Sequence, residues 1–248
     1  ASGVGYQVIP DSSTYIQDEL GFSGIPSFSV HATCLSFVVA LHTAANFIHS
    51  GAYQRILIVS SDQGTRGRNF DEPESAALLG DGAAAVVVEP TPEGEPSEII
   101  AWKMSTFPKG ASLTEVRGGG TRLHPNDPRT VPADNVFHMD GLSVYKMARR
   151  RVAVMFKRLF EETGYTPEDV DLMVPHQASG PAVEVVARYG FAPDKIVNII
   201  GETGNCVAAS LPMALATAHQ DDRMKRGDLV MMAGTGAGLS VAGMLLRW

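Results

Sequence analysis

The stretch Val30-His31-Ala32-Thr33-Cys34-Leu35-Ser36-Phe37 joins a short predicted strand, residues 27–30, to a long apolar helix, residues 34–50. Gly51 ends the helix, and an apolar run over residues 55–60 then predicts a buried strand. This order of strand, helix and strand is typical of a βα unit in an α/β fold. Cys34 lies at the point where the first strand meets the helix.

The last third of the chain repeats this plan. A strand is predicted over residues 196–200, followed by Gly204 and Asn205, a helix to about Asp222 and a buried strand over residues 228–233. Cys34 and Asn205 precede the next buried strand by similar numbers of residues, so we predict that they occupy matching places. A glycine-rich turn and a second apolar strand follow in each half. The repeat therefore predicts an α/β fold of two similar halves that share a site.

The remaining elements fit between these two units. Residues 12–20 predict a helix, residues 83–89 a strand, residues 141–162 a helix, and residues 171–175 a strand that ends at His176. Residues 107–137 are rich in Gly, Pro, Asn and Asp, which predicts a long excursion loop that could shape a pocket entrance. We predict an N-terminal half over residues 1–138 and a C-terminal half over residues 139–248.

Composition excludes several classes of protein. The formal charge of −7 argues against a broad nucleic-acid surface, although one helix carries a run of cations between Lys146 and Arg158. Two cysteines without metal-ligand spacing predict no metal site and a reduced, cytoplasmic setting, and no apolar run reaches the ~20 residues of a membrane helix. The start, Ala1 to Tyr6, resembles mid-protein sequence, so we expect an upstream segment.

Three polar residues are candidates for chemistry. Cys34 begins a helix, where free N–H groups and the helix dipole favour a thiolate, although a lone cysteine is more often a buried structural residue. His176 follows a strand at the carboxyl end, where α/β sheets present their sites. Asn205 could serve as a helix cap or face a cavity beside Gly204. Cys206 is interpreted as a packing residue.

Two glycine-rich turns suggest different roles. Gly236-Ala237-Gly238 could bring backbone N–H groups close to a developing oxyanion. Gly80-Asp81-Gly82 lacks the spacing of either phosphate-binding glycine motif, so nucleotide binding is not predicted from it.

Taken in order, these motifs resemble the ketoacyl synthase III branch of the thiolase-like condensing enzymes. The matching segments are His31 to Cys34, Leu79 to Ala85, Val174 to Ser179, Gly204 to Pro212 and the C-terminal Gly236 to Trp248. The resemblance implies a thiolase-like αβαβα layered fold of two similar halves, a homodimer, and an N-terminal half whose first strands and helix are missing from this chain.

The resemblance also implies a reaction. Cys34 would take an acyl group from acyl-CoA or an acyl carrier protein, with the backbone N–H groups of Cys34 and Ala237 as the oxyanion hole. His176 and Asn205 would bind the carbonyl of a malonyl-type thioester during a decarboxylative Claisen condensation. The product would be a 3-oxoacyl thioester, formed without a metal or another cofactor.

Several positions depart from the family pattern. Pro181 and Pro73 stand where primary-metabolism members tend to carry arginines, and Ser179 replaces an asparagine. The resemblance places Ile9 where relatives line the partner's acyl pocket, and it places Gly236 and Gly238 beside the substrate. These departures leave the acyl chain, the extender and the carrier open.

Other functions stay open at this point. The same scaffold could transfer the acyl group to oxygen or nitrogen, or condense two acyl thioesters without decarboxylation. A non-catalytic partner subunit would generally lose the cysteine that this chain keeps. A cysteine hydrolase could also use Cys, His and Asn. The duplicated plan favours the synthase.

Overall fold

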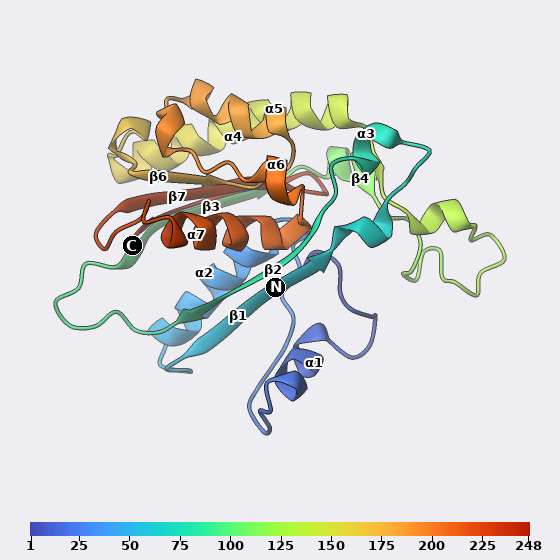
Figure 1. Cartoon of the computed structure of the whole chain (residues 1–248), viewed down its shortest axis with the longest axis horizontal. Coiled ribbons are helices and arrows are strands. Elements are labelled where there is room, and N and C mark those ends of the chain that lie inside the picture. Colours follow the sequence, from blue (N-terminus) through green and yellow to red (C-terminus); the bar gives the residue numbers. More distant parts are fainter.

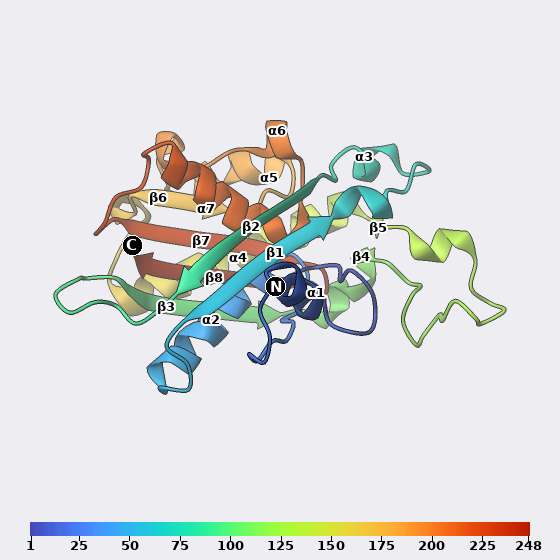
Figure 2. The ribbon, with the colours of Figure 1, turned by 60° about the horizontal axis from the view of Figure 1, so that its bottom comes forward.

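A computed structural model describes all 248 residues, and its elements lie in stacked layers (Figure 1). One sheet has four strands in the order β3-β8-β7-β6: β3 (Glu98–Thr106), β8 (Ser240–Arg247), β7 (Leu229–Gly236) and β6 (Leu172–Pro175). Only β6 and β7 are parallel. A second, two-stranded antiparallel sheet pairs β1 (Ile56–Gln63) with β2 (Asp81–Val88) and crosses in front of the first in Figure 2.

Two helices fill the layer between the sheets. α2 (Ser36–His49) and α7 (Ser210–Gln220) contact each other, with the two-stranded sheet on one side and strands of the larger sheet on the other. Each helix leads into an antiparallel pair, α2 into β1–β2 and α7 into β7–β8. The predicted repeat of helix, strand and strand is therefore confirmed, and both copies meet along α2 and α7.

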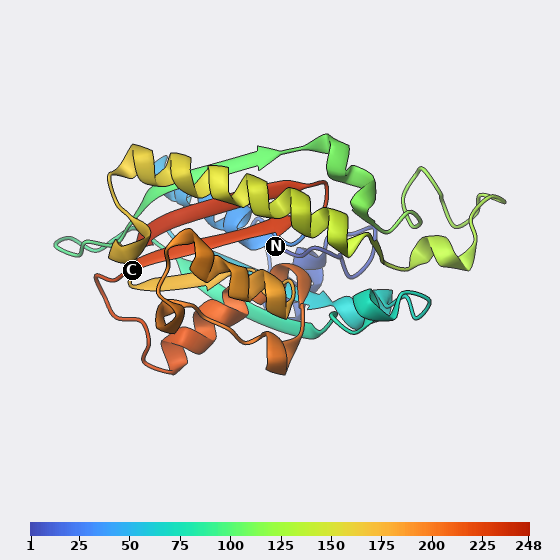
Figure 3. The same ribbon diagram turned by 90° about the horizontal axis from the view of Figure 1, so that it is seen from above.

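The outer face of the four-stranded sheet is covered by α4 (Gly141–Thr163), with α5 (Gly180–Glu184) beside it (Figure 3). Asp140 caps α4 by accepting a hydrogen bond from the N–H of Ser143, and Gly164 ends the helix with a φ of 75°. Met155, Phe156 and Leu159 point into the sheet and are buried. The predicted helix over residues 141–162 is confirmed.

The largest core cluster lies in the middle layer. Leu35 and Phe37 from the start of α2 pack with Leu211 of α7 and with Met232 and Met244 of the sheet, and all five are fully buried. Burial of such side chains stabilises a fold by about 1.5–3 kcal/mol each. The residue after Cys34 is thus part of the core, which fixes the position of the cysteine.

Two predicted strands are not formed. Residues 27–30 pair with no strand. In residues 196–200 only Ile196 bridges Met173, and α6 (Ile200–Thr203) already begins at residue 200. The N–H of Ile199 donates to the side chain of Gln177 and not to a neighbouring strand, so the ladder stops.

β3 lies outside the predicted elements and changes the division of the chain. The boundary predicted at residue 138 assigns β3 to the first half, yet β3 pairs along its length with β8. Strand pairing therefore places the boundary between β2 and β3, at residues 89–97. We therefore propose this boundary in place of the one expected at residue 138.

The excursion loop projects from one end of the layers (Figure 1). It is closed at its base by β4 (Thr114–Glu115), which pairs with β5 (His138–Met139), and it approaches α3 (Pro73–Ala76). α1 (Ser12–Glu19) lies below β1 in Figure 1, and none of its residues is buried. None of these helices combines the length and the apolar character that crossing a bilayer requires.

Candidate active site

Cys34 occupies a tight turn just before α2. The hydroxyl of Ser36 accepts a hydrogen bond from the N–H of Ala32 at 2.9 Å and donates to the carbonyl of Thr33 at 2.6 Å. Thr33 has a φ of 51°, which is uncommon for a β-branched residue and marks a turn held by its surroundings. The turn therefore presents Cys34 in a fixed direction at the helix start.

The end of β7 packs directly on this turn. A Cβ on Gly236 would come 2.5 Å from the Thr33 hydroxyl, and a Cβ on Gly234 would come 3.3 Å from Cδ2 of Leu35. Glycine alone permits such close approach of two backbones. The contact brings the next residue, Ala237, close to the Cys34 turn.

The Cys34 thiol is held in its neutral form. Burial raises its pKa to about 12, and the negative charge of Asp62 acts in the same direction. The hydrogen bonds from the N–H groups of Cys34 and Ala237 act in the opposite direction, because they stabilise the thiolate. The cysteine is therefore a thiol at rest, with two donors already directed at the sulfur.

His176 is fixed by its own backbone and by Gln177. The N–H of His176 continues the pairing of β6 with β7 by donating to Ala233, while the fully buried Gln177 donates to the carbonyls of Pro175 and Val197. Burial lowers the pKa of His176 to about 4, so its imidazole is neutral near pH 7. Nδ1 of His176 is buried and has no hydrogen-bond partner.

Asn205 lies in a loop that both halves of the molecule hold. Its N–H donates to Leu78 at 2.7 Å, and its carbonyl accepts from the N–H of Gly80 at 3.0 Å. The side-chain oxygen accepts from the N–H of Val207 at 2.9 Å, and the side-chain nitrogen donates to the carbonyl of Ala178 at 3.3 Å. One of the two amide hydrogens of Asn205 is therefore left to donate elsewhere.

Close packing explains the turn Gly80-Asp81-Gly82. A Cβ on Gly80 would lie only 1.9 Å from the carbonyl oxygen of Thr203, and a Cβ on Gly82 would meet the side chain of Met213 at 2.3 Å. Both glycines let the start of β2 press against the Asn205 loop. The absence of a phosphate motif in this turn thus agrees with its structural role. Cys206 is buried in the same contact, as a packing residue.

Contacts of neighbouring residues join the three segments that carry Cys34, His176 and Asn205. Gly234 touches both Leu35 and His176, and Asn205 hydrogen-bonds Ala178, two residues after His176. Cys34 and Asn205 do not match residue for residue, however. Thr33 and Val207 each precede a central helix by three residues and share a φ of 51°, so these two are the equivalent positions. Asn205 therefore lies two residues before the equivalent of Thr33.

The remaining candidate residues lie in different places. Gly236 contacts the Cys34 turn, and Gly238 follows with a φ of 131° and only Ser240 within 4 Å of an added Cβ. Ile9 is 81% exposed and lies on the N-terminal excursion, so it lines no part of this cluster within the chain. No group of three or more His, Cys, Asp or Glu side chains is arranged to bind a metal.

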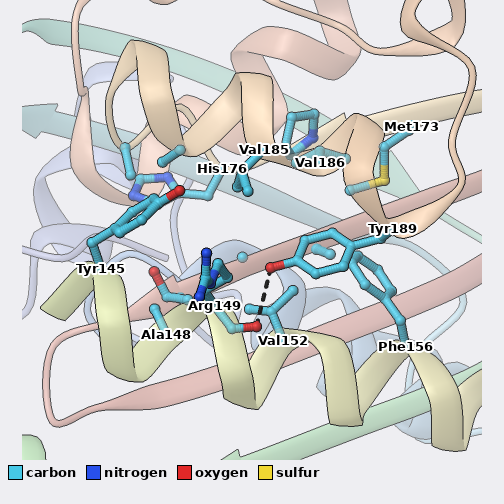
Figure 4. Close-up of a pocket in the computed structure, with 16 residues that line it drawn as sticks. Tyr145, Ala148, Arg149, Val152, Phe156, Met173, His176, Val185, Val186 and Tyr189 are labelled. Carbon is cyan, nitrogen blue, oxygen red and sulfur yellow. Dashed lines mark hydrogen bonds between the residues drawn. The ribbon is translucent and has the colours of Figure 1, made fainter.

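A small apolar cavity adjoins His176 (Figure 4). It measures about 80 Å³ and lies between α4 and α5 over the ends of β6 and β7. Tyr145 and Arg149 of α4 lie on one wall, and the hydroxyl of Tyr189 donates to the carbonyl of Arg149 at 3.1 Å. Sequence reasoning missed this cavity, together with Gln177, Gly234 and Asp62, because their roles depend on contacts between distant segments.

Comparisons with known proteins identify relatives along nearly the whole chain. The sequence model of the 3-oxoacyl-[acyl-carrier-protein (ACP)] synthase III family matches residues 28–108, and that of its C-terminal part matches residues 160–248. The chain is 31% identical to the beta-ketoacyl-[acyl-carrier-protein] synthase III of Clostridioides difficile, over 97% of this chain and 73% of that protein. The chain is 33% identical to the protein of the same name from Brucella anthropi, over 100% of this chain and 76% of that protein.

Solved structures agree with these sequence matches. The crystal structure of 3-oxoacyl-(acyl carrier protein) synthase III from Pseudomonas aeruginosa superposes with a TM-score of 0.88 and 28% identity. The match covers 100% of this chain and 75% of that one. The expected thiolase-like α/β fold is thereby confirmed.

Proposed function

Because this chain belongs to the 3-oxoacyl-[acyl-carrier-protein] synthase III family of enzymes, we propose that it condenses an acyl thioester with a malonyl-type thioester through Cys34. The acyl donor would be acyl-CoA or an acylated carrier protein, and the product a 3-oxoacyl thioester. The proposal includes a homodimer, in which Ile9 would reach the acyl pocket of the partner. Its main support is the close packing of Gly234 and Gly236 of β7 on the Cys34 turn and on His176.

In the first half-reaction the Cys34 sulfur attacks the thioester carbonyl and expels the carrier thiol, which takes the proton that Cys34 loses. The carbonyl oxygen becomes an oxyanion on the carbon that is now bonded to that sulfur. The N–H groups of Cys34 and Ala237, which lower the pKa of the thiol, would stabilise this oxyanion. Gly236 and Gly238 flank Ala237, and of these two only Gly238 is loosely packed, so the acyl group would pass on the side of Gly238.

In the second half-reaction the malonyl-type thioester loses its carboxylate as CO₂ and becomes an enolate. Neutral His176 and the free amide hydrogen of Asn205 would donate to the thioester oxygen, where the enolate charge develops. The enolate carbon then attacks the acyl group on Cys34 and expels the Cys34 thiolate. A proton from solvent restores the thiol, so atoms and charges balance.

Mass spectrometry of the protein after incubation with a panel of acyl-CoAs tests the first step. We expect an adduct with the mass of the acyl group on the peptide that contains Cys34. The variant Cys34→Ala should form none, and the matched control Cys206→Ala should form it normally, since Cys206 is a packing residue. Absence of any adduct in the wild-type protein would favour a non-catalytic partner subunit.

Addition of a malonyl thioester to the acylated protein tests the second step. Release of CO₂ with formation of a 3-oxoacyl thioester is the expected result. Release of the free acid would indicate a hydrolase, and an acylated protein that releases no CO₂ would contradict decarboxylation and favour another acceptor.

A further inference from the structure

Asp62 is a buried carboxylate near the end of β1 that joins two distant segments. Its side chain is 2% exposed, and a buried charge requires hydrogen-bond partners. Oδ1 accepts from the N–H groups of Gly3 and Val4, both at 2.9 Å. Oδ2 accepts from those of Ala208 at 3.1 Å and Ala209 at 3.3 Å. One side chain thus binds the start of the chain to the loop before α7.

The second pair of bonds reaches Asn205. Ala208 directly follows Val207, whose φ of 51° is strained for a β-branched residue. The N–H of Val207 in turn donates to the side-chain oxygen of Asn205. Asp62 therefore holds the turn that orients the Asn205 amide, although it does not contact Asn205 itself.

The first pair of bonds reaches the Cys34 turn. The imidazole of His31 hydrogen-bonds the carbonyl of Gly3 at 3.0 Å. A Cβ on Gly3 would come 2.3 Å from Cγ1 of Val207 and 3.3 Å from the carbonyl oxygen of Thr33. Gly3 thus packs between Thr33 and Val207. These two residues have left-handed backbone conformations and lie close to Cys34 and Asn205 in the chain.

We propose that Asp62 is a positioning residue that sets the separation between the Cys34 turn and the Asn205 turn. It acts through Gly3 and Val4 on one side and through Ala208 and Ala209 on the other, and it touches no substrate. The inference rests on the proposed function, because only a reaction between groups on both turns needs their separation to be fixed.

The charge of Asp62 supplies a readout that a purely structural residue would lack. It contributes to the raised pKa of Cys34, so a neutral residue at position 62 should lower that pKa. Among charged or titratable neighbours, Asp62 is the one whose charge acts on the thiol, since His176 is neutral above about pH 4.

The test compares the wild-type protein with Asp62→Asn, which keeps the shape but has one acceptor oxygen for four N–H groups. We expect kcat for condensation to fall about 10- to 100-fold, because misplacement by about 1 Å can cost about 10²-fold. The KM for the acyl thioester should change much less. The pH profile of Cys34 alkylation by iodoacetamide should shift to lower pH.

Asp81→Asn is the matched control. Asp81 lies one register position away on β2, paired with Gln63, and its carboxylate bonds only Thr65. This variant should leave both readouts unchanged. If Asp62→Asn folds and also leaves both unchanged, the inference is wrong.

Hydrogen exchange of the wild-type protein keeps the test decisive if Asp62→Asn does not fold. The amides of residues 3, 4, 208 and 209 should be protected to the same degree, since one carboxylate holds them all. Rapid exchange at 208 and 209 alone would overturn the inference. Failure of the wild-type protein to form an acyl adduct would instead contradict the proposed function. The pH profile of Cys34 alkylation would still test the effect of Asp62 in that case.

Discussion

A Cβ on Gly234 would come 2.7 Å from the Cβ of His176, so His176 packs directly against the backbone of this glycine. The same Cβ would approach Cδ2 of Leu35, next to Cys34, at 3.3 Å. His176 and the Cys34 turn therefore share a single contact on β7. Any side chain at position 234 would move one of them.

We expect Gly234→Ala to impair condensation more than acylation of Cys34. The added methyl group displaces His176, so kcat should fall about 10- to 100-fold. Steady-state kinetics and mass spectrometry of the acylated protein separate the two steps. Gly201→Ala is the control, because a Cβ there meets nothing within 4 Å. Equal activity of both variants would show that His176 needs no such support.

Alkylation of Cys34 should accelerate throughout the range from pH 7 to pH 10. With a pKa of about 12, the thiolate fraction rises about tenfold for each pH unit below that value. The rate of reaction with iodoacetamide, measured in the Cys206→Ala background, reports on Cys34 alone. A plateau near pH 8 would mean that the two N–H groups outweigh burial.

Protonation of His176 should destabilise the folded protein in acid. Its pKa of about 4 is below the ordinary 6.5, so the unfolded chain binds the proton first. The stability from neutral His176 is complete above about pH 6.5 and is lost as the pH falls towards 4, by about 3 kcal/mol. Urea unfolding between these pH values should be less pH-dependent in His176→Gln than in the wild-type protein or in His49→Gln. Parallel pH dependences would refute this origin.

Sequence patterns located the elements that have their own periodicity. The helix before β1 and the strand that ends at His176 follow from local apolar runs, and both were predicted with nearly correct bounds. β3 was missed, because it is recognised by its pairing with β8, more than 100 residues away. Gly3 and Asp62 have no local signal, since their roles arise only where segments 59 residues apart meet.

The same reasoning explains the candidate site. Cys34, His176 and Asn205 stand at ends of elements, so position along the chain singles them out. The exact correspondence of Cys34 and Asn205 could not be predicted, because counting back from the strands ignores the four residues between Asn205 and α7. The departure at Ser179 has a local explanation, because its hydroxyl caps α5 by accepting from the N–H of Ala182.

The base of the excursion loop should loosen above neutral pH. Glu72 hydrogen-bonds the His138 ring at 2.8 Å and accepts from the N–H of Met139. Hydrogen bonds to Ala133 and Glu72 raise the pKa of His138, and the bond from His138 lowers that of Glu72. The contact is therefore complete between about pH 4.5 and 6.5, and it weakens as rising pH removes the His138 proton.

Limited trypsin digestion at Arg122 and Arg129 measures this loosening. Cleavage, corrected for the pH dependence of trypsin on a peptide, should increase from pH 6.5 to 8.5 in the wild-type protein. In His138→Ala it should be fast at every pH. Glu161→Gln removes an exposed ion pair with Lys157 elsewhere and is the control. A wild-type rate independent of pH would contradict the assigned contact.

Asn205→Asp should separate the two half-reactions most sharply. The new carboxylate still accepts from the N–H of Val207, so the turn should keep its shape. It replaces the donor near Ala178 with a negative oxygen, which repels the enolate formed on loss of CO₂. Removal of one such donor costs about 10²- to 10³-fold in kcat, so CO₂ release should fall by that order while Cys34 is still acylated.

Asn198→Asp, which alters an amide that bonds only the N–H of Ile200, is the control for Asn205→Asp. If Asn205→Asp released CO₂ at the wild-type rate, the enolate would have to be stabilised by His176 without Asn205.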